Sequence, residues 1–150
     1  MIILKLEDSW GFQISKIAQE MDSQFSKKLT KYDIGSREYG ILLTIHQYAL
    51  LTQLKIGELN KVDRTTIGQL VDLLERKDFV ARQKNPKDRR QNLLVLTKTG
   101  RSLVEEMWQE MKEIEKDVLK HLSAKQKETL LTMVKAQTTT LFSSVMPMYC

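Results

Sequence analysis

The sequence contains few of the residues on which several classes of protein depend. Cysteine occurs once, as Cys150, which excludes a disulfide framework and a cysteine metal cluster and favours a reducing compartment, the cytoplasm. The 150 residues include only 6 glycines and 2 prolines, so we expect a mainly helical chain. The two histidines, His46 and His121, lie far apart without the spacing of metal ligands. We therefore expect no metal and no other cofactor.

Long hydrophobic runs are also missing. Residues 1–4 are apolar, but Lys5, Glu7 and Asp8 follow at once, so this end is expected to be neither a signal peptide nor a membrane span. Nothing later approaches the run of about 18 apolar residues that a transmembrane helix needs. The sequence also lacks GxSxG, P-loop, dinucleotide-binding and HExxH motifs. We expect a protein that has no membrane partner, no catalytic residues and no enzyme activity.

Residues 61–101 carry the strongest functional signal. Asp63 is a good N-cap for a helix whose apolar positions (Ile67, Leu70, Val71 and Leu74) recur at helical spacing, while its opposite face is small or polar. Two short runs of strand-forming residues, 79–84 and 93–96, follow on either side of a polar loop, 85–92. Helix, strand, basic loop and strand in this order predict a winged helix.

Charge is concentrated on the predicted wing. Residues 82–90 hold five bases and one acid, a local balance of +4 in a chain whose total is only +5. A basic loop beside a polar helix face suits double-stranded DNA, because its cations displace condensed counterions while the helix enters a groove. A solvated hairpin tip is often charged for no functional reason. The adjoining polar-faced helix favours the DNA-binding interpretation.

The flanking segments are predicted to be amphipathic helices. A first helix is expected over about 9–32, a second from a Ser36 cap to about 50, and a short third after Thr52. After a Thr97 cap, a long helix is expected over 98–121, and a last one from Ser123 to near Pro147. The apolar stripes of the first, fifth and sixth helices exceed what one small centre covers. They predict a homodimer, in which two recognition helices reach successive major grooves.

The predicted fold is therefore mainly α with a small β-wing, in a single domain over residues 1–150. Its centre, residues 36–97, is a winged helix-turn-helix for DNA binding. Residues 1–35 and 98–150 supply the dimerisation helices. A winged helix can also serve as a protein-interaction or RNA-binding module, in which case no two-fold operator is required; a polar recognition face argues against that alternative.

Several short motifs between Leu51 and Gly100 occur in a characteristic order. They are Leu51-Thr52-Gln53, Val62-Asp63-Arg64-Thr65-Thr66, Leu74-Glu75-Arg76-Lys77, Val80-Ala81-Arg82, Pro86-Lys87-Asp88-Arg89-Arg90 and Leu96-Thr97-Lys98-Thr99-Gly100. Together they resemble the MarR family of bacterial transcription regulators, and the Asp-Arg-Arg tip followed by Leu-Thr-x-x-Gly is the most specific part. The resemblance implies an obligate dimer that binds pseudo-palindromic DNA near promoters, often as a repressor released by a small molecule.

Three departures from the family pattern put local geometry in question. Asp78 stands where the family usually has glycine before the wing, so that turn is open to rearrangement. Gly57 replaces the usual alanine in the third helix, and Asn60-Lys61 replaces a Leu-Gly pair in the turn after it.

The resemblance assigns roles within the wing. It implies that Arg90 enters the minor groove and that Asp88 orients it; an acid two positions earlier can pair with the guanidinium and restrict its rotamers. The alternative is that Arg90 pairs only with Asp88 or a phosphate. Arg89 either contacts DNA or stabilises the wing, and Lys84 and Lys87 suit phosphate contacts.

On the recognition helix, Gln69 suits adenine and Thr65 a thymine methyl or phosphate, although both are ordinary exposed helix residues too. Arg64 suits a phosphate contact or a contact at the dimer centre. The whole predicted DNA-binding set is Arg64, Thr65, Thr66, Gly68, Gln69, Lys84, Lys87, Asp88, Arg89 and Arg90.

The resemblance also implies an effector pocket between the dimerisation helices and the winged centre. The candidate lining residues are Trp10, Ile14, Ile17, Met21, Tyr39, Leu43, His46 and Met107, which would suit a small aromatic or apolar effector. Ordinary core packing is the simpler explanation of each of these residues, because a methionine or aromatic stripe at helical spacing needs no ligand. Peroxide sensing through a cysteine near the N-terminus is not expected, because the only cysteine is Cys150.

Overall fold

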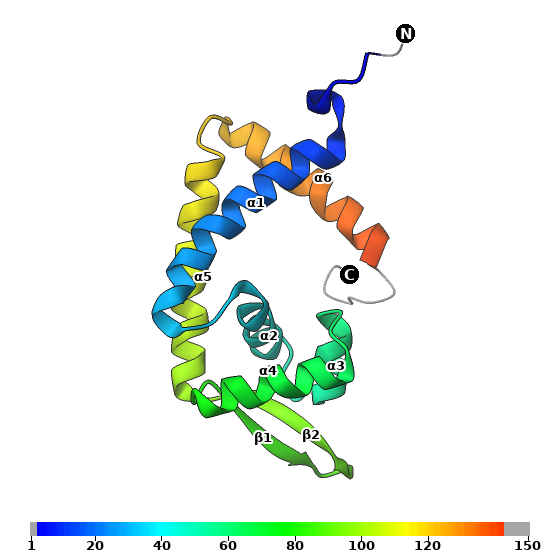
Figure 1. Ribbon diagram of the computed structural model, residues 1–150, viewed down its shortest axis with the longest axis vertical. Helices are drawn as coiled ribbons and strands as arrows, with labels where there is room; N and C mark the ends of the chain where they lie inside the picture. Colours follow the sequence, from blue (N-terminus) through cyan, green and yellow to red (C-terminus); the bar gives the residue numbers. More distant parts are fainter. Residues whose placement is uncertain (1–2, 143–150) are drawn as a thin grey trace.

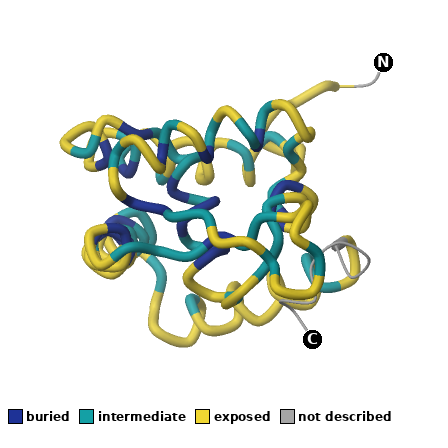
Figure 2. Tube along the Cα trace, turned by 90° about the horizontal axis from the view of Figure 1, so that it is seen from below, coloured by how far each residue is buried: buried dark blue, intermediate teal, exposed yellow. Residues whose placement is uncertain are grey.

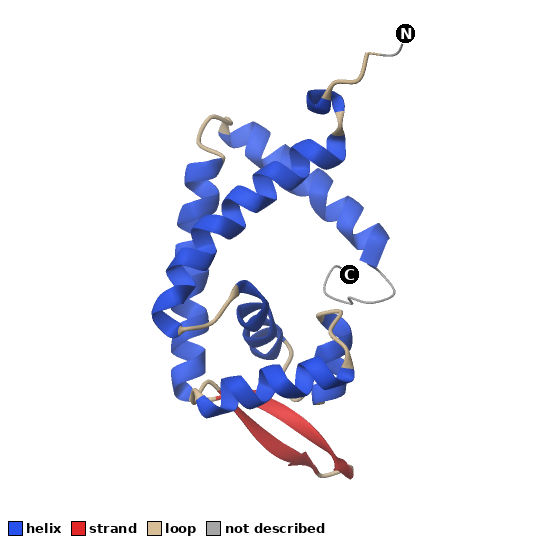
Figure 3. Cartoon of the chain, in the orientation of Figure 1, coloured by secondary structure: helices blue, strands red, loops and turns tan. Residues whose placement is uncertain are grey.

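A computed structural model describes residues 3–142, and it is mainly helical with one two-stranded wing (Figure 1; Figure 3). Two short 3-10 helices, Leu6–Asp8 and Thr30–Tyr32, flank α1. The main elements are α1 (Trp10–Leu29), α2 (Ser36–Gln47), α3 (Gln53–Leu59), α4 (Arg64–Arg76), β1 (Val80–Asn85), β2 (Asp88–Leu96), α5 (Lys98–Val118) and α6 (Ala124–Phe142). The predicted fold class is confirmed. The predicted end of the last helix near Pro147, and Cys150, lie outside the described residues.

The chain separates into two ends joined by α5. The helices α2, α3 and α4 and the wing lie together at one end, and α5 runs from the wing to the opposite end, where a turn leads into α6 (Figure 1). Helix α1 packs along α5. Lys28 binds Glu110 at 3.0 Å, and both Lys31 and Tyr32 bind Glu106, so the end of α1 is attached to the middle of α5. None of the helices in residues 3–142 has both the length and the apolar composition to cross a membrane.

Most helix boundaries follow from caps that the sequence displays. Thr52 accepts a hydrogen bond from the backbone N–H of Lys55 at 3.1 Å, and Ser123 and Gln126 form the predicted reciprocal pair before α6. Several predicted boundaries were wrong. Gly35, not Ser36, is the N-cap of α2, because the Glu38 carboxylate accepts the Gly35 N–H at 3.0 Å and Ser36 is already helical. Helices α1, α2 and α5 end at Leu29, Gln47 and Val118 rather than at about residues 32, 50 and 121.

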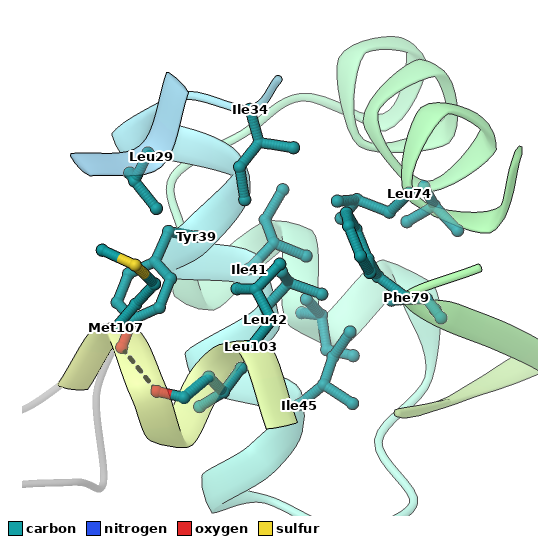
Figure 4. Close-up of a cluster of buried hydrophobic side chains, with 14 of the residues drawn as sticks. Leu29, Ile34, Tyr39, Ile41, Leu42, Ile45, Leu74, Phe79, Leu103 and Met107 are labelled. Atoms are coloured by element: carbon teal, nitrogen blue, oxygen red, sulfur yellow. Dashed lines mark hydrogen bonds between the residues drawn. The ribbon is translucent and has the colours of Figure 1, made fainter. Parts of the chain in front are cut away.

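The hydrophobic core lies where α2 meets α1, α4 and α5. Side chains from all four helices and from Phe79 converge there (Figure 4), and Leu29, Leu42, Leu74 and Met107 are completely buried. Buried segments accordingly occupy the centre of the molecule, with exposed residues around them (Figure 2). This core fixes the recognition helix to the long helix that leaves the winged end.

Tyr39 brings a polar hydroxyl into this core. Its hydroxyl donates to the carbonyl oxygen of Val104 at 3.1 Å, and its ring packs edge-on against Phe25 at a centroid distance of 4.9 Å. Burial raises the pKa of Tyr39 to about 12.

The root of the wing and the start of α5 are fastened at one point. Thr97 caps α5 by accepting the Gly100 N–H at 3.0 Å, while its own hydroxyl donates to the carbonyl oxygen of Asp78 at 2.5 Å. The backbone N–H of Thr97 donates to the carbonyl oxygen of Phe79 at 3.1 Å. A Cβ built on Gly100 would lie 2.0 Å from that same oxygen, so only glycine fits there. These contacts give the Leu-Thr-x-x-Gly motif a structural reason.

The departures from the family pattern are accommodated locally. Asp78 adopts φ 59°, the left-handed conformation that glycine takes most easily, and its carboxylate accepts from the Thr99 hydroxyl at 3.4 Å. Lys61 takes the same conformation at φ 54°. The side-chain amide of Asn60 donates to the Thr44 hydroxyl at 3.1 Å, which joins the turn to α2. At Asp78, the turn before the wing therefore has the backbone geometry that the usual glycine would adopt.

A different constraint applies at Gly57. A Cβ there would lie 3.2 Å from both Ile67 Cγ2 and the carbonyl oxygen of Val62, so glycine lets α3 approach α4 closely.

Candidate nucleic-acid interface

The recognition helix α4 presents a polar face outward. Ile67, Val71 and Leu74 are buried, as the periodicity predicts. Arg64, Thr65, Gln69 and Asp72 are exposed, and Gly68 and Thr66 are half-buried. On the outer face, the backbone is therefore partly accessible at Gly68, beside the exposed amide of Gln69 and the exposed hydroxyl of Thr65.

Asp63 fixes the start of α4. Its carboxylate accepts the backbone N–H groups of Thr65 and Thr66 at 3.0 and 2.9 Å and the Thr66 hydroxyl at 2.6 Å. These bonds, the Thr66 hydroxyl first, lower the pKa of Asp63. The Thr66 side chain is thus engaged in the cap, whereas the Thr65 side chain stays exposed.

The wing is longer than the sequence suggested. Strand β2 begins at Asp88, not Leu93, and pairs antiparallel with β1 from Val80↔Leu96 onward. The turn is reduced to Pro86-Lys87, and the Asn85 side chain accepts the Lys87 N–H at 3.0 Å. The sequence interpretation missed this because polar residues such as Gln91 and Asn92 fill the strand near its tip.

The tip contains an irregularity that displays two arginines. Lys84 pairs with Asn92 and Asn85 with Asp88, so residues 89–91 of β2 have no counterparts on β1. Asp88 accepts both Arg90 Nε at 3.0 Å and Arg90 Nη2 at 3.1 Å, which confirms the predicted pairing. The same pair lowers the pKa of Asp88, and the Arg90 side chain nevertheless remains 89 % exposed. Asp88 therefore orients Arg90 while the Arg90 side chain stays accessible to a partner.

A groove of about 410 Å³ separates the wing from the helix-turn-helix. Arg64 lies on the helical wall and Arg90 on the wing wall. The remaining lining residues are Thr52, Gln53, Leu54, Ile67, Asp88, Gln91 and Asn92. Four of these polar residues, Thr52, Gln53, Gln91 and Asn92, were not among the predicted site residues. Their proximity comes from long-range pairing, with Leu94 N–H donating to the Leu51 carbonyl oxygen at 3.1 Å, and no local motif signals it.

The charge count of the wing needs a correction. Arg82 was included in the basic stretch, but its guanidinium binds Asp72 at 2.6 Å and Glu75 at 2.8 Å on α4. Without it, residues 83–90 hold four bases and one acid, a balance of +3. The exposed bases of this tip are Lys84, Lys87, Arg89 and Arg90.

The structure divides the candidate effector residues into two groups. Tyr39 and Met107 are buried in the core, with Met21 and Leu43 half-buried against it, so ordinary core packing explains these four. In contrast, Trp10, Ile14 and Ile17 on α1 are 84 %, 61 % and 44 % exposed, and His46 is exposed as well. Within one chain the eight residues do not line a common site, and ordinary core packing is wrong for the exposed Trp10, Ile14, Ile17 and His46.

Apolar side chains are exposed at the end of the molecule away from the wing. Besides those of α1, they include Ile3, Leu4 and Leu6 before it and Leu130, Leu131, Met133, Val134 and Leu141 on α6. Such a concentration of exposed large apolar side chains is typical of an interaction surface. In residues 3–142, no group of three acidic, histidine or cysteine side chains is placed to hold a metal ion.

Comparison with known proteins gives one consistent result. A family model described as MarR family matches residues 34–91. The uncharacterized HTH-type transcriptional regulator YdcH of Bacillus subtilis is 30 % identical over 95 residues, which are 60 % of this chain and 64 % of that protein. The aligned stretch thus spans a little under two thirds of YdcH. The multiple antibiotic resistance protein MarR of Escherichia coli is 27 % identical over 126 residues, covering 83 % of this chain and 88 % of that protein.

The solved structures agree over more of the chain. The crystal structure of a mutant MarR from Escherichia coli complexed with operator DNA superposes with a TM-score of 0.73 at 27 % identity, covering 84 % of this chain and 91 % of that one. Sequence motifs, the order of the elements and these similarities lead to one conclusion. The chain resembles the MarR family of winged-helix transcription regulators over its winged centre, and it shares the fold of the solved structure.

Proposed function

We propose that this protein is a sequence-specific DNA-binding regulator that acts as a homodimer on a pseudo-palindromic operator, as a repressor. The observation that carries the proposal is the exposed Arg90, orientated by Asp88 at the wing tip, across a groove from the polar start of α4. A helix in the major groove and a thin wing in the adjacent minor groove use these two surfaces together. The similar mutant MarR of Escherichia coli was solved in complex with operator DNA, which supports DNA binding.

Each exposed polar residue then has a chemical role. Gln69 can make a paired contact with an adenine edge, and Thr65 can contact a thymine methyl group. Gly68 lets the backbone of α4 approach the bases closely. Lys84 and Lys87 bind phosphates, which position the protein without reading sequence. Arg64 on the helical wall of the groove and Arg89 at the wing tip add phosphate contacts, and Thr66 orders the helix start through Asp63.

The exposed apolar surface of α1, α6 and the residues before α1 supports the homodimer. In one chain Trp10, Ile14 and Leu131 are all more than half exposed to water. Packing them against a second copy removes that surface from water and places the two α4 helices on one side of the assembly. Each α4 then meets one half-site, about one helical turn of DNA from the other.

We further propose that a small aromatic or apolar effector releases the repressor. The exposed Trp10, Ile14 and Ile17 of α1 supply an apolar wall for it once a second chain covers them. The place of action is the cytoplasm, where a bacterial chromosome is accessible.

Selection of bound duplexes from a random DNA library, with the mass of the protein measured alongside, tests the main proposal. A dimer should enrich an inverted repeat whose half-sites lie about one turn apart. A monomer that enriches no sequence would contradict the proposal and favour a protein-interaction or RNA-binding module.

The selected operator then tests the wing. Arg90→Ala should weaken operator binding by about tenfold or more while the dimer persists. Lys125→Ala is the matched control, because Lys125 is an exposed cation in the first turn of α6. That turn follows the end of α5 that lies opposite the wing (Figure 1). Equal affinity of Arg90→Ala and wild type would show that the wing does not contact the operator.

A further inference from the structure

Arg82 lies in the basic stretch of the sequence, but all three nitrogens of its guanidinium donate hydrogen bonds to protein. Nη2 donates to Asp72 Oδ1 at 2.6 Å and Nη1 donates to Glu75 Oε2 at 2.8 Å, both on α4. Nε donates to Gln53 Oε1 at 3.1 Å, at the start of α3, and Nη2 also reaches the carbonyl oxygen of Gly68 at 3.5 Å. We call Arg82, Asp72, Glu75 and Gln53 the Arg82 cluster. It joins three elements through one side chain.

The geometry of the cluster differs from that of a DNA-contacting arginine. The Arg82 side chain is 24 % exposed, whereas that of Arg90 at the tip is 89 % exposed. A planar guanidinium with several charged and neutral acceptors loses its rotamer freedom, because each bond fixes it further. Arg82 lies in the middle of β1, on the same face of the strand as the exposed Lys84. It therefore links the wing to the middle of α4 below the tip.

We propose that Arg82 is a positioning residue that sets the spacing between the wing and the recognition helix. Through the Arg82 cluster it determines the register in which Arg90 and α4 meet adjacent grooves. This inference rests on the proposed DNA-binding function, and it concerns specificity. A duplex whose half-site matches α4 gains binding affinity from the wing only when the wing is held at the distance that fits the adjacent groove.

The opposing hypothesis is that Arg82 is one more phosphate contact in a basic loop. The two hypotheses predict opposite effects of removing its acidic partners. Asp72 and Glu75 lie on the recognition helix with side chains 53 % and 44 % exposed, so they repel nearby phosphates. The double variant Asp72→Asn, Glu75→Gln removes that repulsion and frees Arg82. Phosphate contact predicts tighter binding to every duplex, whereas positioning predicts weaker binding to the operator.

The experiment measures affinity for the selected operator and for a scrambled duplex across a salt series. For Arg82→Gln we expect at least about a tenfold loss on the operator, less than about a threefold change on the scrambled duplex, and an unchanged salt slope. The Asp72→Asn, Glu75→Gln variant should show the same loss of preference. Lys84→Gln is the matched control on the same strand: it should lower the slope by about one on both duplexes and leave the preference intact.

Arg82→Lys separates the hypotheses again, because lysine keeps the charge but not the fork of donors. We expect it to retain the operator defect of Arg82→Gln. Restored operator binding by Arg82→Lys, or tighter operator binding by the double variant, would each overturn the inference. Circular dichroism of each variant at the binding temperature confirms that folded protein is compared.

Failure of the proposed function can be told apart from failure of this inference. If wild-type protein selects no duplex, DNA binding is rejected. Amide hydrogen exchange then tests whether the Arg82 cluster positions the wing. Positioning predicts faster exchange in β1 and β2 of Arg82→Gln than of wild type, with α6 unchanged. Equal exchange in the wing of the two proteins would overturn it.

Discussion

Replacing Gly100 by alanine should destabilise the protein, although alanine is the better helix former. The added Cβ would lie 2.0 Å from the carbonyl oxygen of Phe79 and 2.8 Å from its carbonyl carbon. An ordinary contact needs about 3.4 Å, so the start of α5 and the wing root must separate by about 1.4 Å. Both atoms belong to backbone, so no flexible side chain can absorb the movement.

The free energy of unfolding should fall by about 2 kcal/mol, the net of a steric cost and a smaller helix-propensity gain. Overpacking a tight site costs about 1–3 kcal/mol, and the upper end applies because the hydrogen bond from Thr97 N–H to the Phe79 oxygen is strained by the same movement. The intrinsic preference of helices for alanine returns only about 1 kcal/mol. The steric cost therefore exceeds the gain, and the sign of the change is destabilising.

Gly11→Ala and Gly68→Ala are the matched controls, since both glycines are helical. A Cβ on Gly11 has nothing within 4 Å, and one on Gly68 would lie 3.7 Å from Gln53 Nε2, an ordinary contact. Both variants should be more stable than wild type by about 0.5–1 kcal/mol. Urea unfolding followed by circular dichroism, at one fixed protein concentration because dimer stability depends on it, measures all three. A Gly100→Ala variant as stable as the controls would refute the steric argument.

Three further changes test other parts of the structure. Tyr39→Phe removes the bond to the Val104 carbonyl oxygen and should cost about 1 kcal/mol in urea unfolding; an unchanged midpoint would mean that the bond contributes nothing. Lys87→Ala should lower the salt slope of DNA binding by about one on operator and scrambled duplex alike, and an identical slope would remove Lys87 from the interface. A hydrogen bond from Lys77 at 2.7 Å lowers the pKa of Asp33, so this pair stabilises the protein at neutral pH and is lost as pH falls through the lowered pKa. Asp33→Asn should therefore narrow the difference in thermal midpoint between about pH 7 and about pH 3, and an equal difference would contradict the linkage.

Local signals were sufficient for the helices and for the existence of the wing. The spacing of Ile67, Val71 and Leu74 predicts the buried face of α4, and the caps at Thr52, Asp63 and Thr97 predict three helix starts, all of which the structure confirms. These features depend on residues within four positions of each other, so periodicity and hydrogen-bonding chemistry are enough.

Features that depend on distant residues were not predictable in the same way. Arg82 looks like part of a basic loop until Asp72 and Glu75 are placed beside it, ten and seven positions away in the chain. The groove brings Gln53 opposite Asn92 because β2 pairs with the residues before α3. Polar strand residues near the wing tip carry no apolar alternation, which is why the predicted strands stopped short.

Because Thr97 and Gly100 at the start of α5 contact Phe79 at the wing root, a rotation of α5 moves the wing. The 21 residues of α5 span about 32 Å from this junction to the end near α6. A tilt of about 5° about that far end displaces the wing root by about 3 Å, close to the roughly 3.4 Å rise between base pairs. Because the contact at this junction is between backbone atoms, the wing root moves together with the start of α5. A rotation of α5 by only about 5° thus shifts the wing root by nearly one base-pair step along a duplex.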